Sequence, residues 1–242
     1  MSKGDAHIAR LSPSDKRFTA DSSSRLLASL APPSRFTSSF LASARFLYVE
    51  SCFINRFNFG LDFGASGRLV VTDTSFKRES TGIRVKPGLQ ASSASITHCR
   101  IEDGTLGLDV EDQADVVVRD TLIGDSVSYG VVCKASLAGK VANVSIENSS
   151  INGCATTCSE GIGIMASATA GFAKVWLSNT TVTQNKVGVQ IGTNAIIYSF
   201  QNNRIAGNVA DVKGGALRPL VLTYLMEPRL WFKSDLYERA AE

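Results

Sequence analysis

The chain has 242 residues, of which 44% are hydrophobic and 19% charged, and a formal net charge of +3. This length allows one large domain or two small ones with a substantial buried core. The charge is too small and too evenly spread to indicate a nucleic-acid partner. No apolar run approaches the roughly 18 residues of a membrane-spanning helix.

Residues 1–40 are rich in serine and contain four arginines against few acids. They include no apolar stretch of about 7–15 residues before a small-residue cleavage site, so no clear secretory signal is present and the compartment stays unassigned. We expect a disordered or wrongly started leader here. A weak helical cap is expected from about Ser24 to Ala31.

Residues 41–215 carry seven copies of one six-residue template: large apolar, variable, polar turn-former, small or polar, variable, large apolar. The copies are VESCFI (49–54), VTDTSF (71–76), ITHCRI (96–101), VRDTLI (118–123), IENSSI (146–151), LSNTTV (177–182) and FQNNRI (200–205). Successive copies start 22, 25, 22, 28, 31 and 23 residues apart. A repeat of this length is typical of solenoid proteins.

A second, glycine-led motif alternates with the first. Its copies are GLDF (60–63), GIRV (82–85), GLDV (107–110), GVVC (130–133), GIGI (161–164), GVQI (188–191) and a degenerate VADV (209–212). Two apolar residues separated by one outward position indicate a short strand. A further alternation precedes the first template, from Leu47/Val49 in the first repeat to Tyr198/Phe200 in the last, and predicts fourteen inward positions.

Each repeat therefore contains two or three strands of about 3–5 residues joined by Gly, Asn, Asp and Ser turns. The spacing leaves no room for the helix of a βαβ unit. An antiparallel sandwich does not explain identical templates in one register, whereas a parallel β-solenoid stacks like residues about 4.8 Å apart. The prediction is an all-β, single-stranded parallel β-helix of about seven coils.

The segments VESCFINRFNFGLDF, ASITHCRIEDGTLGLDV and VWLSNTTVTQNKVGVQI resemble right-handed parallel β-helix repeat proteins of the pectate-lyase-like superfamily, closest to bacterial members of unassigned activity. The resemblance covers about residues 44–215 and implies a right-handed coil. It says little about chemistry. The Asn-Thr-Asp, Asp-Asp and Gly-His-Gly motifs of polygalacturonase-like enzymes and the Asp-Pro-His motif of alginate epimerases do not occur in the sequence.

The adjacent His98 and Cys99 raise the question of a catalytic or metal-binding pair. Cys99 aligns with Cys52 and with Thr, Ser and Asn in the other repeats, which indicates a small buried residue where the coil bends. His98 aligns with Ser51, Asp73, Asp120 and three asparagines, residue types that tolerate left-handed turns. We predict a turn ladder, with a catalytic or metal role for Asp73, His98 and Asp120 as the alternative.

The outward position of the glycine-led strands supplies the candidate binding residues. In repeat order it holds Asp62, Arg84, Asp109, Val132, Gly163, Gln190 and Asp211. Asp62, Arg84 and Asp109 are expected on successive coils, facing solvent. In β-helix enzymes that act on polyuronates, such charged residues bind carboxylate sugars or act as acids and bases. The alternative is a ladder of alternating charge that neutralises itself across coils, in which Arg84 stays cationic.

Other features suggest less. Outward Tyr48 and Trp176 could stack on sugar rings, but five coils separate them. Cys133 is expected in the core, and a local disulfide between Cys154 and Cys158 requires export. No zinc-type cysteine–histidine cluster, calcium-type acid cluster, phosphate loop or nucleophile elbow occurs, so we expect no metal and no cofactor.

Residues 216–242 form an apolar tail, interrupted by Pro228, that either folds over the last coil or contacts a partner protein. For the whole chain, the missing catalytic motifs favour a non-catalytic structural or binding module that recognises polysaccharide along a sheet face. The alternative is a carbohydrate-active lyase, epimerase or hydrolase of acidic polysaccharide using Asp62, Arg84 and Asp109.

Overall fold

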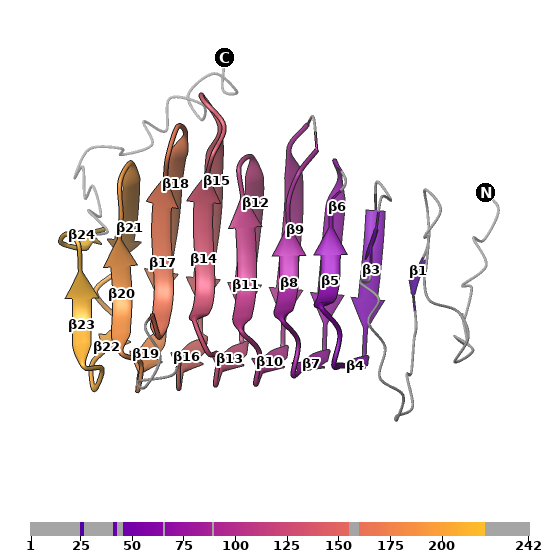
Figure 1. Cartoon of the computed structure of the whole chain (residues 1–242), viewed down its shortest axis with the longest axis horizontal. Coiled ribbons are helices and arrows are strands. Elements are labelled where there is room, and N and C mark those ends of the chain that lie inside the picture. The colour runs from indigo at the N-terminus through magenta and orange to yellow at the C-terminus, as the bar shows by residue number, and fades with distance from the viewer. Residues whose placement is uncertain are drawn as a thin grey trace, which may run out of the picture.

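Three parallel β-sheets wind around one shared interior, as the computed structural model shows (Figure 1). The structure describes residues 25–26, 41–42, 46–64, 66–88, 90–154 and 160–220. These contain strands and turns but no helix, and therefore no helix that could cross a membrane. The all-β parallel solenoid predicted from the repeats is confirmed.

Each sheet takes one strand from every coil. Sheet A contains β1 (Arg25–Leu26), β3 (Phe46–Glu50), β6 (Arg68–Thr72), β9 (Ser92–Thr97), β12 (Ala114–Arg119), β15 (Val141–Glu147), β18 (Phe172–Ser178), β21 (Ala195–Ser199) and β24 (Arg218–Pro219). Sheet B contains β2 (Leu41–Ala42), β5 (Phe59–Phe63), β8 (Thr81–Val85), β11 (Leu106–Glu111), β14 (Tyr129–Ala135), β17 (Ile162–Ala168), β20 (Val187–Ile191) and β23 (Ala210–Lys213). Sheet C contains β4 (Phe53–Asn55), β7 (Ser75–Lys77), β10 (Arg100–Glu102), β13 (Leu122–Gly124), β16 (Ser150–Asn152), β19 (Thr181–Thr183) and β22 (Arg204–Ile205).

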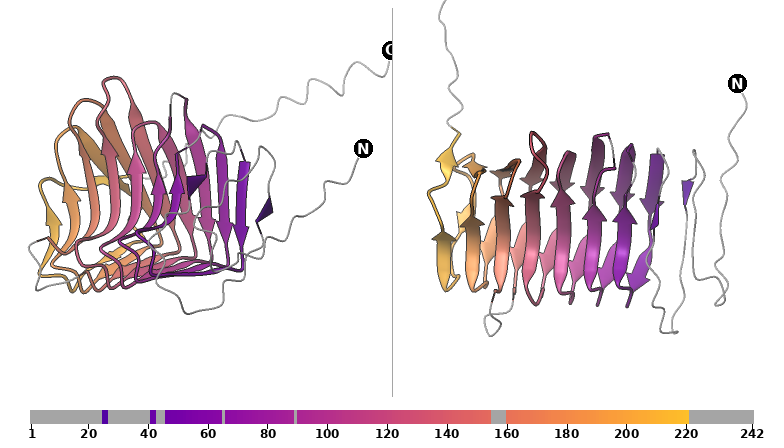
Figure 2. Two further views of the ribbon diagram at one scale, coloured as in Figure 1. Left: turned by 45° about the vertical axis from the view of Figure 1, so that its right-hand side comes forward. Right: turned by 45° about the horizontal axis from the view of Figure 1, so that its top comes forward.

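The coils follow one another along the stack in chain order, as the colours in Figure 2 show. The seven strands of sheet C span six complete turns from β4 to β22, one fewer than the expected number of about seven coils. At one end, β1 and β2 extend sheets A and B by one further strand each, through parallel pairing with β3 and β5. At the other end, β24 pairs with β21.

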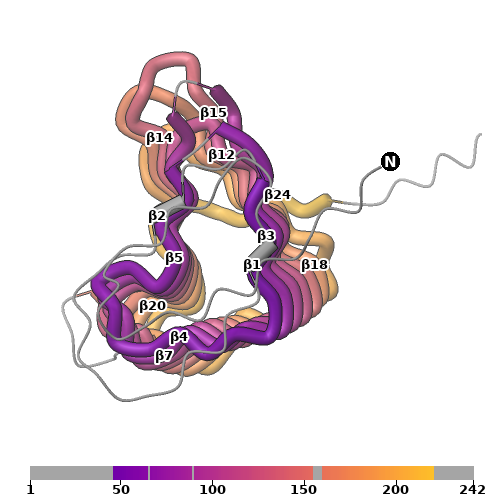
Figure 3. Tube along the Cα trace, turned by 90° about the vertical axis from the view of Figure 1, so that its right-hand side faces the viewer, coloured from indigo at the N-terminus to yellow at the C-terminus, as the bar shows by residue number. Residues whose placement is uncertain are grey.

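The interior is filled by inward columns from all three sheets, and the view down the stack shows the coils superimposed around it (Figure 3). Twelve of the fourteen inward positions predicted on sheet A are confirmed, with at most 4% of each residue exposed. They are Leu47, Val49, Leu69, Val71, Ala94, Ile96, Val116, Val118, Val144, Ile146, Val175 and Leu177. Because similar apolar residues stack on one another, contact with the coils above and below removes each of them from water. Cys133 is fully buried, as expected.

A column of glycines runs along sheet B, where the backbones of neighbouring coils approach closely. It consists of Gly60, Gly82, Gly107, Gly130, Gly163 and Gly188. A Cβ at Gly107 would lie 2.5 Å from the carbonyl oxygen of Gly130 and 2.5 Å from Ile123 Cγ2. The recurrent glycine of the second motif is therefore required because no side chain fits between the coils.

The turn between sheets A and C is the ladder predicted around His98 and Cys99. The first turn residue has a positive φ in six coils: Ser51, Asp73, His98, Asp120, Asn148 and Asn179. The second turn residue is small and buried, and its side chain commonly accepts a hydrogen bond from the preceding coil. For example, Cys99 N donates to Thr121 Oγ1 at 3.3 Å, and Thr121 N donates to Ser149 Oγ at 3.2 Å.

The turn between sheets C and B has its own column of buried and half-buried residues, which the sequence analysis missed. Its members are Phe57, Glu79, Gly104, Ser126, Cys154, Asn185 and Asn208, each directly after a positive-φ residue. Asn185 and Asn208 form a ladder in which Asn185 N donates to Asn208 Oδ1 at 3.0 Å. Glu79 is the exception, because it places a carboxyl group with 4% exposure in this column.

Stability near neutral pH is expected to depend on Glu79. Glu79 Oε2 accepts a hydrogen bond from Phe57 N, whereas Oε1 is buried and has no partner among the described residues. Burial raises the pKa of Glu79 to about 7. The unfolded chain releases this proton near pH 4.5 and the folded chain near pH 7, so stability falls as pH rises through this window.

We expect the free energy of unfolding to drop by about 2 kcal/mol between pH 5 and pH 8 on account of this group. In Glu79→Gln the amide oxygen keeps the bond to Phe57 N but does not titrate, so this part of the pH dependence disappears. Urea unfolding of both proteins at pH 5, 6, 7 and 8 measures the difference. Parallel pH profiles for the two proteins would contradict the assignment.

Three register predictions need correction. In the last coil, Val175 pairs with Ile197 and Leu177 with Ser199, so the inward positions are not Tyr198 and Phe200. The reason is one extra residue in the turn, since Thr181 pairs with Arg204 and Ser199 is five residues before Arg204. The left-handed residue accordingly is Gln201 rather than Asn202. A one-residue slip moves every side chain of a strand to the other face.

The other two corrections concern the glycine-led strands. Val132 pairs with Met165 and Gln190 with Lys213, so Met165 and Lys213 replace Gly163 and Asp211 in the outward row. In the motif GIGI the second glycine, Gly163, and not the first belongs to the glycine column, so the predicted register was wrong by two residues there.

Part of the predicted termini can be compared with the structure. At Arg25–Leu26 the chain is strand β1 rather than helix, because these residues continue sheet A. The remainder of the expected cap, from 27 to 31, lies outside the described residues. The same holds for residues 221–242 of the apolar tail, so its role as a cap or partner surface stays a prediction.

Candidate functional site

The three predicted site residues lie side by side on the outward face of sheet B. Asp62 on β5 pairs with Arg84 on β8, and Arg84 pairs with Asp109 on β11. The glycine column and the inward residues on either side fix this register, because a shift would place a side chain where only glycine fits. The sequence prediction that these residues occupy successive coils is therefore right.

Arg84 is bound to Asp62 by two parallel hydrogen bonds. Arg84 Nε donates to Asp62 Oδ1 at 2.8 Å and Arg84 Nη2 donates to Asp62 Oδ2. The guanidinium carbon lies 4.1 Å from the centroid of the Phe59 ring, so the same group also makes a cation–π contact. The hydrogen bonds to Asp62 raise the pKa of Arg84 above its ordinary value, and it cannot serve as a base.

Asp109 belongs to a second group of charges, which includes three residues that sequence reasoning missed. Lys134 Nζ lies 3.0 Å from Asp109 Oδ2 and 3.3 Å from Glu111 Oε1. Lys86 Nζ lies 3.4 Å from Glu111 Oε2. Lys86, Glu111 and Lys134 directly follow the glycine-led motifs GIRV, GLDV and GVVC, so extending each motif by one residue would have found them.

The carboxyl groups of Asp109 and Glu111 have unusual acidities. Burial, together with neighbouring Glu111, raises the pKa of Asp109 to about 6 against the opposing effect of Lys134. For Glu111, burial acts in the same direction, but Lys134 and Lys86 outweigh it and the pKa is lowered. Asp109 Oδ1 is buried and has no hydrogen-bond partner among the described residues.

The six residues Asp62, Arg84, Lys86, Asp109, Glu111 and Lys134 are called the charged cluster below. They alternate in sign from strand to strand: negative on β5, positive on β8, negative on β11 and positive on β14. Their contacts are those of the self-neutralising ladder that the sequence left open as an alternative. Such cross-strand pairs stabilise the stacking of coils.

The expectation that Asp62 and Asp109 face open solvent is wrong. Their side chains are only 6% and 7% exposed, whereas those of Arg84, Lys134 and Lys86 are 25%, 38% and 53% exposed. The carboxylates are buried, whereas the long cationic side chains that pair with them stay partly exposed to water. The cluster is electrically neutral as a whole but presents its cations outward.

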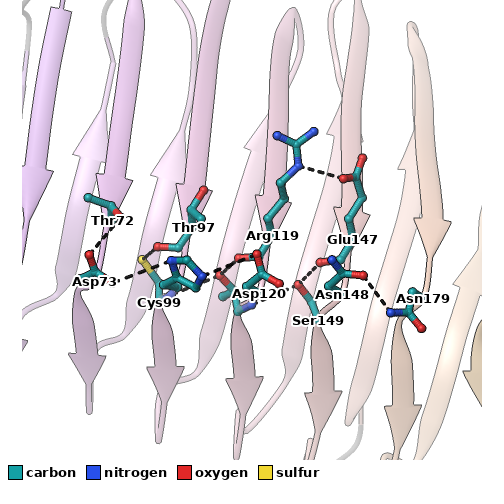
Figure 4. Close-up of polar contacts among 12 residues, drawn as sticks. Thr72, Asp73, Thr97, Cys99, Arg119, Asp120, Glu147, Asn148, Ser149 and Asn179 are labelled. Atoms are coloured by element: carbon teal, nitrogen blue, oxygen red, sulfur yellow. Dashed lines mark hydrogen bonds and ion pairs between the residues drawn. The ribbon is translucent and has the colours of Figure 1, made fainter.

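The polar turn column that includes Asp73, Asp120, Asn148 and Asn179 forms a separate row (Figure 4), and its residues are exposed. His98 Nδ1 is 3.9 Å from Asp73 Oδ1 and His98 Nε2 is 3.7 Å from Asp120 Oδ2, with all three side chains at least 40% exposed. The two ring nitrogens point to different carboxylates, so the three groups do not converge on one ligand position. Asn179 Nδ2 continues the row by donating to Asn148 Oδ1 at 2.8 Å.

The remaining candidates provide no reactive centre within the described residues. Burial raises the pKa of Cys99 to about 11 and of Cys133 to about 12, which keeps both thiols protonated. Cys154 is a buried free thiol, and Cys158 lies outside the described residues. The described residues contain no group of three or more His, Cys, Asp or Glu that could hold a metal ion.

Trp176 stacks on Tyr198, with ring centroids 5.6 Å apart and planes 16° apart. One face of each ring is therefore covered by the other ring. This contact depends on the register of the last coil, in which Tyr198 points outward, and it was not predicted. It occupies a ring face that was considered for sugar stacking.

A family model described as "Right handed beta helix region" matches residues 40–208. The match covers more than half of the chain and nearly all of the described coils, and it agrees with the predicted hand of the solenoid. No curated protein and no solved structure matches the chain.

Proposed function

The chain belongs to the right-handed β-helix family, and on this scaffold we propose a non-catalytic binding module that recognises a polysaccharide along the outward face of sheet B. The charged cluster is the proposed contact surface. The observation that carries the proposal is the outward display of Arg84, Lys86 and Lys134 above buried carboxylates.

Two features of this face suit a polymer. Coils repeat about every 4.8 Å, which is close to the length that one sugar ring adds to an extended chain, so neighbouring coils can contact neighbouring sugars. Arg84 uses Nε and Nη2 for Asp62, and its other N–H groups remain available to hydroxyl or carboxylate oxygens. Asp62 and the Phe59 ring hold the guanidinium in place, which reduces the entropy lost on binding.

The test is affinity electrophoresis of the full chain through gels that contain pectin, alginate or a neutral glucan, followed by staining of the polymer. We expect retardation of the wild type in at least one gel. The double variant Asp62→Asn/Arg84→Gln removes both members of one ion pair, so neither is left as an unpaired buried charge, and we expect about tenfold weaker binding. His98→Ala, in the turn between sheets A and C, is the matched control and is expected to bind like the wild type.

Free migration of the wild type in every gel would refute the binding proposal. Equal retardation of the double variant and the wild type would mean that the binding surface lies outside the charged cluster. Thermal unfolding of each variant, followed by circular dichroism, establishes that differences in migration do not come from unfolding.

The second candidate is a carbohydrate-active enzyme at the same face, and one observation favours it. A carboxyl group with a pKa near 6, beside a second carboxylate, is suited to proton transfer near neutral pH. Cleared polymer along the track of the wild type, absent for Asp109→Asn, would support this function. Retardation with intact polymer would support the binding module.

A further inference from the structure

Asp109 lies in the middle of the charged cluster, and charged side chains from its own strand and from both neighbouring strands surround it. On β14, Lys134 faces its Oδ2 at 3.0 Å and Cys133 lies on the inward side as a neutral thiol. On its own strand, Glu111 shares Lys134 with it. On β8, Arg84 is already bound to Asp62, and Lys86, directly after β8, is bound to Glu111.

The two oxygens of Asp109 therefore differ. Oδ2 accepts from the ammonium of Lys134, whereas Oδ1 is buried without a partner among the described residues. An ionised carboxylate with one unsatisfied buried oxygen is disfavoured, and a proton on it is the simplest remedy. No comparable vacancy exists at Asp62, whose two oxygens both accept from Arg84.

We propose that Asp109 is a proton-operated control of this face: when it takes up a proton, Lys134 is released toward an anionic group of a bound polysaccharide, and affinity for acidic polymers rises. The proposal rests on the proposed function, since it describes the regulation of the same surface. With three anionic and three cationic side chains the charged cluster is neutral, and one added proton makes its net charge +1. Lys134 then keeps one ionised partner, Glu111, and its ammonium group is already partly exposed.

The sign of the effect follows from the acidity of Asp109. Because its pKa is about 6, the side chain is ionised at pH 8 and protonated at pH 5. One additional unit charge near the ligand is expected to strengthen binding of an anionic chain by about threefold to tenfold. By linkage, a bound anionic chain also makes Asp109 retain its proton to higher pH.

The experiment measures binding of fluorescently labelled dextran sulfate and of labelled, uncharged dextran to the full chain at pH 5, 6, 7 and 8 and constant ionic strength. Dextran sulfate keeps its charge over this range, so any pH dependence belongs to the protein. Asp109→Asn fixes the site in its uncharged form. His98→Gln is the matched control, because it replaces a titratable side chain that lies outside the charged cluster.

We expect wild type and His98→Gln to bind dextran sulfate threefold to tenfold more tightly at pH 5 than at pH 8. Asp109→Asn is expected to bind at every pH with the affinity that the wild type has at pH 5. An unchanged pH dependence in Asp109→Asn, or equal binding of both polymers at every pH, would overturn the regulation and leave polysaccharide binding standing. Absence of binding by the wild type to either polymer would remove both.

Discussion

Replacement of Lys134 by Met is expected to destabilise the fold by about 3 kcal/mol at pH 7.5. Met keeps an unbranched apolar side chain of similar length but removes the ammonium that lies 3.0 Å from Asp109 and 3.3 Å from Glu111. Both residues are more than nine-tenths buried; Asp109 would lose its cation, and Glu111 would keep only Lys86. Urea unfolding monitored by circular dichroism measures the change.

The loss is expected to be recoverable. In the triple variant Lys134→Met/Asp109→Asn/Glu111→Gln no buried charge remains unpaired, and most of the stability should return. The single variant should also lose less stability at pH 5, where Asp109 is protonated, than at pH 8. If the triple variant is as unstable as the single one, packing rather than charge explains the effect of Lys134.

Replacement of Gly107 by Ala is expected to cost about 3 kcal/mol, at the upper end of the usual cost of overpacking. The added methyl group would lie 2.5 Å from a backbone oxygen of the next coil and from the fully buried Ile123. Neither neighbour can withdraw, because the oxygen belongs to a strand held on both sides and the side chain is enclosed. Thermal or urea unfolding shows the loss.

Gly64→Ala is the control for this prediction, because a Cβ at Gly64 meets nothing within 4 Å. A change within about 0.5 kcal/mol is expected there. Equal losses at both positions would mean that the cost reflects glycine backbone freedom in general and not the close approach of coils. A neutral Gly107→Ala would mean that the coils can separate at this column.

The sequence by itself determined the solenoid, since the repeat shows in the residues themselves. Columns such as Val49/Val71/Ile96 come from strands whose buried residues alternate with a period of two, and the turn position holds Asp73, His98 and Asp120, which accept a positive φ. Because each side chain in a column packs on similar side chains one coil away, the residue type at each column position is restricted. These local constraints recur along the chain and are therefore visible without coordinates.

The tertiary structure decided the register of the irregular coils and the chemistry of the outward face. One extra residue before Arg204 turned Tyr198 outward onto Trp176, and no local pattern shows which of two adjacent positions absorbs such an insertion. Periodicity placed Asp62, Arg84 and Asp109 in one row. Only the tertiary structure showed that the acids are buried while the lysine and arginine paired with them stay partly exposed, because burial depends on how the side chains of neighbouring strands pack.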